Sequence, residues 1–467
     1  MNRIIIFFYL LFGLFVNAQT VDSVQLNFRE YLGYVKKYHP VAKQAEMVMS
    51  VGQANLMKAR GGFDPKITVD YSTKEFKGSE YYDLLNSTFK VPTWYGIELK
   101  GEFEQYSGEY LNAERNVPDD GLYSAGVALS LGRGSWINER MATVKKAKFF
   151  REQSKADRDL LVNQILFEAS LAYFNWLQAY RNSLLFNDFL LNAKVRLKGV
   201  NRSAQSGEIA AIDTVEAKIA VQNRALEREQ ANVTLRNARL ELSNYLWMGD
   251  NIPMELQEGV VPDTSLDTEI DQALEILGKP LDSFVLENHP KLRSLSYKID
   301  GLVVDKRLKT NKLLPRIDVE YKFITDEPEY LNSFETQNYK AGLNFELPLF
   351  LRKERGDLKL AKLKLRDAQF ELDNAEVQIQ NKITAIYNEL DSFENQNVLI
   401  DEIVSSYAAL LAAEERKFSF GESSLFLINS RESKLIDAVL KQNQVENKYF
   451  TAKAKLFNSL AVNPENL

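Results

Sequence analysis

Histidine, cysteine and paired carboxylates are the side chains that most often perform metal or acid–base chemistry, and this chain offers few of them. It has no cysteine, which excludes disulfides and thiolate metal sites. Its two histidines, His39 and His289, lie far apart, and a proline follows each of them. Because proline suits the first helical turn, we expect each histidine to begin a helix rather than to bind a metal or carry protons.

Carboxylates are abundant, but their spacing is typical of solvated helix surfaces. Glu227, with Arg224 and Arg228 beside it, is one example. The glycine-rich stretch GRGSW, residues 132–136, follows a predicted strand but lacks the lysine pattern of a phosphate-binding loop, so we interpret it as a strand-to-helix joint. We therefore expect no enzyme activity, no cofactor and no metal site.

Composition indicates a folded, exported protein. Of the 467 residues, 45% are hydrophobic, and a net charge of −6 without a basic block argues against nucleic-acid binding. Residues 1–18 combine an early arginine, a short apolar run and a small-residue cleavage site, which predicts a secretory signal peptide. No later segment is apolar enough to predict a membrane-spanning helix.

The elements that would position any site occur twice. Residues 38–71 align without gaps with residues 288–321, and each copy predicts a helix, a proline and an alternating strand. The segment YSAGVALSL (123–131) aligns in the same way with YKAGLNFEL (339–347). Very long helical patterns follow, over about 137–198 and 355–418. Helices of ~60 residues would reach roughly 90 Å.

Each long helix is predicted to end at a glycine and to be followed by a returning helix. The expected organisation is a signal peptide (1–18), a first repeat (19–248, strands about 66–76 and 122–131), a linker (249–282) and a second repeat (283–467, strands about 316–324 and 338–347). The fold class is mainly α-helical with a β part, built from a duplicated helix-strand-strand-long helix-helix unit.

The alternating strands predict a membrane barrel. In DPKITVDY, residues 64–71, apolar and polar side chains alternate, as they do in barrel strands with one face toward lipid. A sheet edge cannot stay unpaired in hydrocarbon, and four strands cannot close a barrel. Several copies must therefore share one barrel, and three copies would give twelve strands. A small sheet packed on helices in a soluble protein is the alternative.

One further alternating segment, residues 94–106, does not fit this scheme. Three crossings would place the following helix on the wrong side of the membrane. We therefore expect an enlarged outer loop over about 77–121, which includes this segment as an extension of the sheet above the bilayer.

This duplicated order resembles the TolC-type outer-membrane efflux proteins over nearly the whole mature chain. The resemblance implies a homotrimer with a twelve-stranded β-barrel in the outer membrane and an α-helical barrel in the periplasm. It also implies a passive exit duct of an efflux pump or type I secretion system. Its partners would be a periplasmic membrane fusion (adaptor) protein, an inner-membrane RND or ABC transporter, and outer-membrane lipid.

The resemblance places the gate and the adaptor-docking surface at the two helix turns. The corresponding residues here are Ser206, Gly207, Glu208, Ala211, Asp213, Phe420, Gly421, Glu422, Ser423, Ser424 and Leu427. Where family members carry an arginine and two aspartates in the second turn, this chain has Ser423, Leu427 and Ser430. We therefore expect packing of Leu425, Phe426 and Leu427 to hold the aperture, with Asp213 and the turn glutamates giving it charge. Solvated turn glutamates and a soluble periplasmic coiled-coil scaffold or adaptor remain the alternatives.

Overall fold

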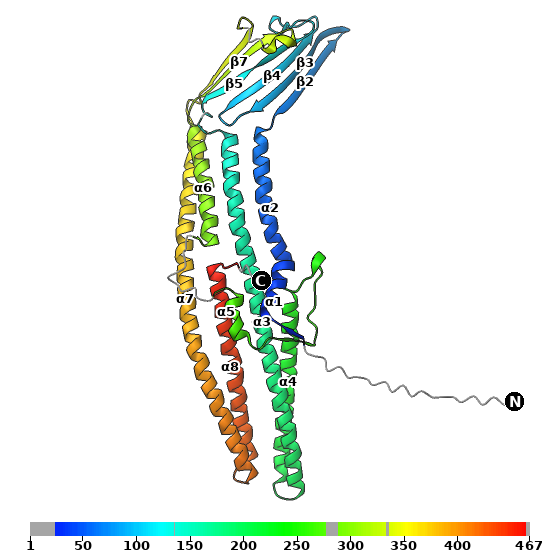
Figure 1. Cartoon of the computed structure of the whole chain (residues 1–467), viewed down its shortest axis with the longest axis vertical. Coiled ribbons are helices and arrows are strands. Elements are labelled where there is room, and N and C mark those ends of the chain that lie inside the picture. Colours follow the sequence, from blue (N-terminus) through cyan, green and yellow to red (C-terminus); the bar gives the residue numbers. More distant parts are fainter. Residues whose placement is uncertain (1–23, 135, 277–287, 333–335, 464–467) are drawn as a thin grey trace, which may run out of the picture.

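The computed structural model describes residues 24–134, 136–276, 288–332 and 336–463. It is a long helical rod with a β-sheet at one end and two helical turns at the other (Figure 1). The predicted signal peptide lies outside the described residues, as does the end of the predicted linker.

Helices form most of the rod. The helices are α1 (Phe28–Tyr38), α2 (Pro40–Arg60), α3 (Glu139–Gln205), α4 (Ala211–Ser243), α5 (Leu266–Ala273), α6 (Pro290–Asn311), α7 (Arg352–Ser419) and α8 (Leu425–Leu460), with short 3-10 turns η1 (Gly61–Phe63), η2 (Ala113–Arg115), η3 (Gly249–Asn251) and η6 (Pro328–Asn332). The predicted long helices are present, and α3 and α7 have 67 and 68 residues. At 1.5 Å per residue each reaches about 100 Å. No helix among the described residues has both the length and the apolar character needed to cross a membrane.

Both histidines begin helices, as the sequence predicted. The His39 Nδ1 accepts a hydrogen bond from the Val41 N–H at 3.2 Å, and the His289 Nδ1 accepts one from the Lys291 N–H at 3.1 Å. Each ring thus satisfies a backbone donor that the first turn of a helix leaves free. Burial lowers the pKa of both histidines, so the neutral rings that can accept these bonds are favoured.

The sheet has six strands rather than four. They are β2 (Lys66–Phe76), β3 (Ser79–Pro92), β4 (Ile97–Ser107), β5 (Leu122–Gly132), β7 (Arg316–Thr325) and β8 (Tyr339–Glu346), in the antiparallel order β2-β3-β4-β5-β7-β8. Residues 77–121, expected as an outer loop in which residues 94–106 extend the sheet, mostly form the β3–β4 hairpin, and this hairpin lies between β2 and β5 in the sheet. The number of strands before α3 is still even, because β3 and β4 form an antiparallel pair. The chain therefore returns to the end of the sheet next to the helices, as expected.

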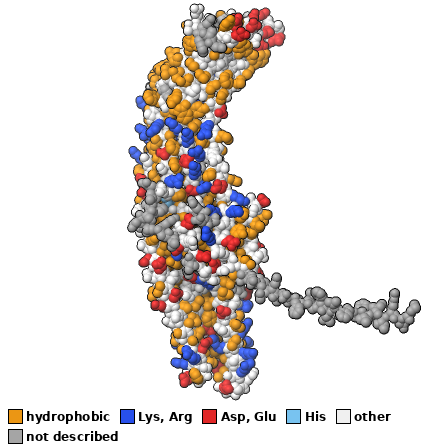
Figure 2. Space-filling view, in the orientation of Figure 1, with side chains coloured by type: hydrophobic (Ala, Val, Ile, Leu, Met, Phe, Trp, Pro, Cys, Tyr) orange, Lys and Arg blue, Asp and Glu red, His pale blue; other side chains and the backbone are white. Residues whose placement is uncertain are grey.

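The two faces of the sheet differ, as alternation predicts. One face carries apolar side chains in register across the strands, and Figure 2 shows hydrophobic residues gathered over the sheet. The opposite face carries ion pairs between strands. The predicted joint GRGSW lies between β5 and α3 in the chain; the Gly134 N–H within it donates to Asn311 Oδ1 at 2.9 Å, and residue 135 lies outside the described residues.

The main core lies midway along the rod, where the two halves of the chain meet. Phe28, Tyr173, Trp176 and Phe457 are fully buried there and belong to one hydrophobic cluster. The Tyr173 hydroxyl joins the short parallel pair β1 (Val24–Leu26) and β6 (Val260–Pro262) to α3, because it donates to Leu26 O at 2.7 Å and accepts from the Asp263 N–H at 3.0 Å.

Candidate functional site: the helical tip

The predicted site lies at the end of the rod opposite the sheet. There α3 turns into α4 and α7 turns into α8 (Figure 1). We call these two turns, residues 206–210 and 420–424, with the adjoining first turns of α4 and α8, the helical tip. The described contacts join α3 to α4, α7 to α8 and α4 to α8, so the two hairpins pack against each other.

The same backbone motif closes both long helices. Gly207 and Gly421 have φ of +79° and +78°, the left-handed conformation that glycine adopts most easily. In the first turn, the Glu208 N–H donates to Ser203 O at 2.9 Å and the Gly207 N–H donates to Ala204 O at 3.2 Å. Glu422 and Gly421 repeat this pattern in the second turn. The predicted glycine caps are therefore confirmed.

Most of the predicted tip residues are accessible in a single copy. Those classed as exposed are Ser206, Gly207, Glu208, Ala211, Phe420, Gly421, Glu422, Ser424 and Leu427, whereas Asp213 and Ser423 are half-buried. Such a surface is open to a second molecule. Ser424 also caps α8, since its hydroxyl accepts from the Leu427 N–H at 3.4 Å.

Ser423 ties the second turn back to α7. Its hydroxyl donates to Glu414 Oε1 at 2.5 Å, and Glu414 is buried. The Arg431 Nε lies 3.8 Å from the other oxygen of this carboxylate. Ser423 thus makes a polar contact of its own within the chain.

Only one of the three apolar residues expected to hold the aperture is buried within the chain. Leu425 is 3% exposed and packs with Val200 and Ala217 between the two hairpins. Phe426 and Leu427 are 67% and 36% exposed, so a single copy leaves them on its surface. Packing by these two residues would require a neighbouring chain.

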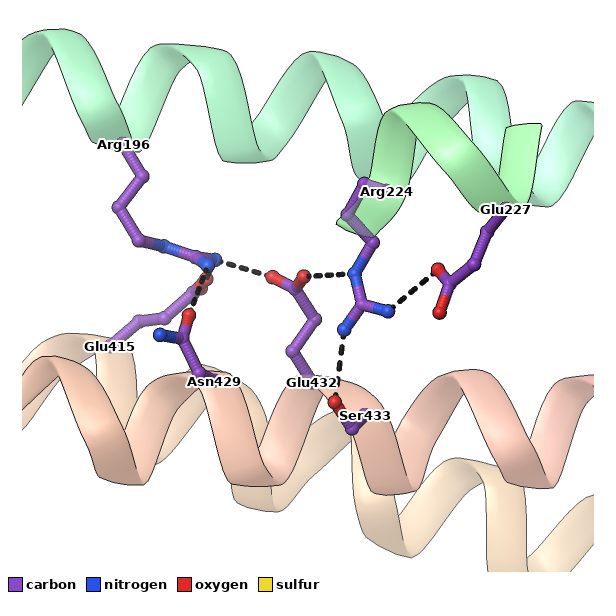
Figure 3. Close-up of polar contacts among 7 residues, drawn as sticks. All are labelled: Arg196, Arg224, Glu227, Glu415, Asn429, Glu432 and Ser433. Atoms are coloured by element: carbon purple, nitrogen blue, oxygen red, sulfur yellow. Dashed lines mark hydrogen bonds and ion pairs between the residues drawn. The ribbon is translucent and has the colours of Figure 1, made fainter. Parts of the chain in front are cut away.

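A buried ionic cluster further up the rod was not predicted (Figure 3). We call it the Glu432 cluster; its members are Arg196, Arg224, Glu227, Glu415, Asn429, Glu432 and Ser433. The Glu432 side chain is 1% exposed, and its two oxygens lie 2.6 Å from Arg196 Nη2 and 3.1 Å from Arg224 Nε. The cluster therefore joins α8 to both α3 and α4.

The surrounding groups accept further hydrogen bonds from the two guanidinium groups. Arg224 also donates to Glu227 at 2.7 Å and to Ser433 Oγ at 3.0 Å. Arg196 also reaches Glu415 of α7 at 3.3 Å. Burial by itself would lower the pKa of Arg224, but its bonds to Glu227 and Glu432 outweigh this and raise it. The arginine thus stays charged, which a buried carboxylate partner requires.

The sequence contains a signal that could have revealed this cluster. Leu425, Ile428 and Leu435 form the buried face of α8, and Glu432 falls at helical spacing on that same face. A carboxylate on an apolar stripe needs a buried cationic partner. The pair Arg224 and Glu227, which we interpreted as a solvated helix surface, supplies part of that partnership.

No other described feature suggests catalysis or metal binding. Among the residues that the structure describes, no group of three or more His, Asp or Glu side chains is placed to hold a metal ion. The tip and the Glu432 cluster consist of caps, ion pairs and apolar contacts. This arrangement can hold helices together or release them, and it can present a surface to a partner.

Comparisons with known proteins agree with this architecture. Residues 283–462 match the outer membrane efflux protein family. A comparison with curated proteins gives no match.

Solved outer-membrane channels share the fold over nearly the whole chain. The Campylobacter jejuni channel CmeC is 15% identical, with a TM-score of 0.64 and coverage of 93% of this chain and 85% of its own. VceC from Vibrio cholerae is 12% identical, with a TM-score of 0.63 and coverage of 93% and 96%. MtrE of Neisseria gonorrhoeae, in its open state, is 13% identical, with a TM-score of 0.63 and coverage of 95% and 92%. The predicted fold class, helical with a β part, is confirmed by this likeness.

Proposed function

We propose that the chain belongs to the outer membrane efflux protein family, which residues 283–462 match, and that it is the outer-membrane exit duct of a tripartite efflux pump or a type I secretion system. It lies in the cell outer membrane and extends into the periplasm. Because proteins of this family are passive channels, the chain acts as a conduit and not as an enzyme, and an inner-membrane transporter supplies the energy.

The observation that supports this function best is the apolar face of the sheet at the end of a rod of polar helices. Ile67 of β2 and Leu343 of β8 are 75% and 73% exposed in a single copy. An exposed apolar face of this extent suits contact with lipid tails. Lys and Arg side chains are frequent on the helices just below the sheet (Figure 2), where lipid headgroups would meet them.

The two ends of the rod suggest which molecules the chain contacts. The edge strands β2 and β8 have unpaired sides, which hydrocarbon does not tolerate, so copies of the chain pair there and form a homotrimer. At the opposite end, the helical tip contacts a periplasmic membrane fusion (adaptor) protein, which connects the duct to an RND or ABC transporter.

The helical tip is also the gate of the duct in this proposal. Its exposed turn residues face the adaptor, and Phe426 and Leu427 pack against neighbouring copies to narrow the aperture. The half-buried Asp213 lies in the first turn of α4, where it adds negative charge near the mouth. Release of the two hairpins from one another would widen the opening.

Fractionation distinguishes this function from that of a soluble periplasmic scaffold or adaptor. Membranes from cells that produce the chain are washed with alkaline carbonate. An exit duct stays with the outer-membrane fraction, runs as a detergent-solubilised trimer and conducts ions in planar bilayers. Release into the wash as a monomer would contradict the proposal and favour the scaffold.

A further inference from the structure

The sheet contains two strands more than the repeated unit of the chain accounts for. The repeat supplies β2 and β5 in the first half and β7 and β8 in the second, whereas β3 and β4 have no counterpart in the second half. Resting on the proposed exit-duct function, we infer that the β3–β4 hairpin is part of the membrane wall. Three copies then close a barrel of 18 strands rather than twelve.

The apolar face is continuous through the added hairpin. Val91 of β3 lies opposite Leu99 of β4, Leu99 lies opposite Val127 of β5, and Val127 lies opposite Tyr321 of β7. A second row runs from Ile67 of β2 through Phe89 of β3, Gly101 and Ala125 to Phe323 and Tyr339. A hairpin outside the bilayer would have no need of a lipid-facing row that matches its neighbours.

The polar face ties β4 to strands of the second repeat. Lys100 Nζ of β4 lies 3.1 Å from Glu320 Oε2 of β7, and Lys322 Nζ of β7 lies 2.7 Å from Glu102 Oε2 of β4. These pairs cross over β5, which separates the two strands. Lys340 of β8 reaches Glu104 of β4 across both β5 and β7, at 3.1 Å.

Small side chains on β5 make these crossings possible. Gly126 lies between Lys100 and Lys322 in the register, and a Cβ at this position would come within 2.6 Å of Lys322 Cα and 2.8 Å of Lys322 Cγ. Ser124 and Ala128 are its neighbours on this face. The sequence of β5 thus fits a strand flanked by β4 and β7, with charges bridging over it.

The geometry of the edges permits closure with six strands per copy. β2 leads away from the helices and β8 leads back toward them, so β2 of one copy pairs antiparallel with β8 of the next. With strands about 4.8 Å apart and tilted by about 40°, twelve strands give a barrel of about 24 Å in diameter and 18 strands one of about 36 Å. The barrel is then far wider than a twelve-stranded one.

Cysteine cross-linking tests the inference, and the chain has no native cysteine to interfere. In the six-stranded sheet Leu99 lies opposite Val127, so the double variant L99C/V127C should cross-link within one chain. If the hairpin were outside the wall, β2 would pair with β5 as β7 pairs with β8. In the repeat alignment Val69 corresponds to Val319, and Val127 corresponds to Leu343. Because Val319 and Leu343 lie opposite each other in the β7–β8 pair, V69C/V127C would cross-link instead.

The variant V319C/L343C is the matched control, because both arrangements place these residues opposite each other. Trimers in outer membranes are treated with a short thiol cross-linker and digested, and linked peptides are identified by mass spectrometry. Linkage in L99C/V127C and the control, with at least tenfold less in V69C/V127C, supports the 18-stranded wall. Linkage in V69C/V127C, or in the control alone, overturns it.

The proposed function is measured separately in the same samples. Carbonate resistance and bilayer conductance of the three variants report whether the chain is an outer-membrane channel. A channel that links through V69C/V127C would retain its function and refute the wider wall. Electron microscopy of the purified trimers provides a second measurement, since a barrel of twelve strands in cross-section would also refute the inference.

Discussion

Glu432 joins the two helical hairpins through two buried ion pairs. A carboxylate that is 1% exposed would be unstable alone, and two guanidinium groups compensate for the loss of water around it. Its partners Arg196 and Arg224 lie on α3 and α4 and not in the turns. Buried ion pairs thus join the hairpins near the proposed gate, although Ser423, Leu427 and Ser430 carry no charge.

The substitution Glu432→Gln should loosen the hairpins. It leaves Arg196 and Arg224 buried without their shared counter-charge, and breaking a buried ion pair costs about 3–5 kcal/mol. We expect a lower thermal midpoint of the helical circular dichroism signal and a higher leak conductance of purified trimers. The matched control is Glu229→Gln, which removes the exposed pair between Glu229 and Arg236 and should change stability by less than about 1 kcal/mol. Unchanged leak in a destabilised E432Q trimer would assign the cluster a structural role only.

The two capping histidines should make the helical rod sensitive to acid. Burial lowers the pKa of His39 and His289 in the folded chain below the ordinary value of 6.5, so the unfolded chain binds protons first as the pH falls. Their contribution to stability is complete above pH 6.5 and declines below it, because a protonated Nδ1 no longer accepts the helix N–H.

The double variant H39N/H289N tests this account. Asparagine also accepts a backbone N–H at a helix start but does not titrate. Between pH 7.5 and pH 5 we expect the thermal midpoint of the natural chain to fall further than that of the variant. Equal falls in the two proteins would show that other groups cause the acid sensitivity.

At the scale of elements, the tip consists of two hairpins with the same cap and different side chains. Leu425 packs between the hairpins, whereas Phe426 and Leu427 lie on the surface of the copy. The roles of these residues can therefore be separated by comparing the stability of the folded chain with the conductance of the proposed trimer. Leu425 should matter in every folded chain, whereas we expect Phe426 and Leu427 to matter only where copies of the proposed trimer meet.

Paired alanine substitutions should separate these roles. Leu425→Ala removes buried contacts and should lower the stability of the chain by about 2–5 kcal/mol. Leu427→Ala should leave the thermal midpoint nearly unchanged yet raise the leak conductance of trimers, because its contacts lie between copies. If L427A trimers leak no more than the natural protein, packing of this residue does not narrow the aperture. The variant Asp213→Ala tests the contribution of charge. Removal of this carboxylate should change the cation selectivity of the trimers.

At the scale of the whole molecule, the sheet of a single copy has two open edges, at β2 and at β8. All residues of β2 and β8 are exposed, and both strands have one side that pairs with no other strand among the described residues. Closure by neighbouring copies would satisfy these backbone groups and cover the edges. The assembly, rather than the chain, is then the stable unit in the membrane.

Hydrogen exchange should report this closure. In detergent-solubilised trimers we expect the amides of β2 and β8 to exchange as slowly as those of β5, which has neighbours on both sides. The β4 strand, also paired on both sides, is the internal reference. Rapid exchange of the edge strands beside slow exchange of β4 and β5 would contradict closure of the barrel at these edges.

Much of this architecture could be predicted because it depends on local patterns. A period of 3.6 or 2 residues, a His-Pro helix start and a Gly-Glu helix end act through neighbouring residues, and duplication repeated each signal. The long helices, the glycine caps at Gly207 and Gly421, and four of the strands followed from these patterns. The likeness to outer-membrane channels then agreed with the order of elements.

Contacts between distant segments could be decided only by the tertiary structure. Arg224 and Glu227 show helix-surface spacing, and only the packing of α8 against α3 and α4 turns Arg224 toward Glu432. Residues 94–106 show the alternation of a strand, but its partners depend on a second strand, β3, and on ion pairs that cross to β7. Periodicity determines which face of an element is apolar, whereas the element that covers this face depends on long-range packing, which local patterns do not encode.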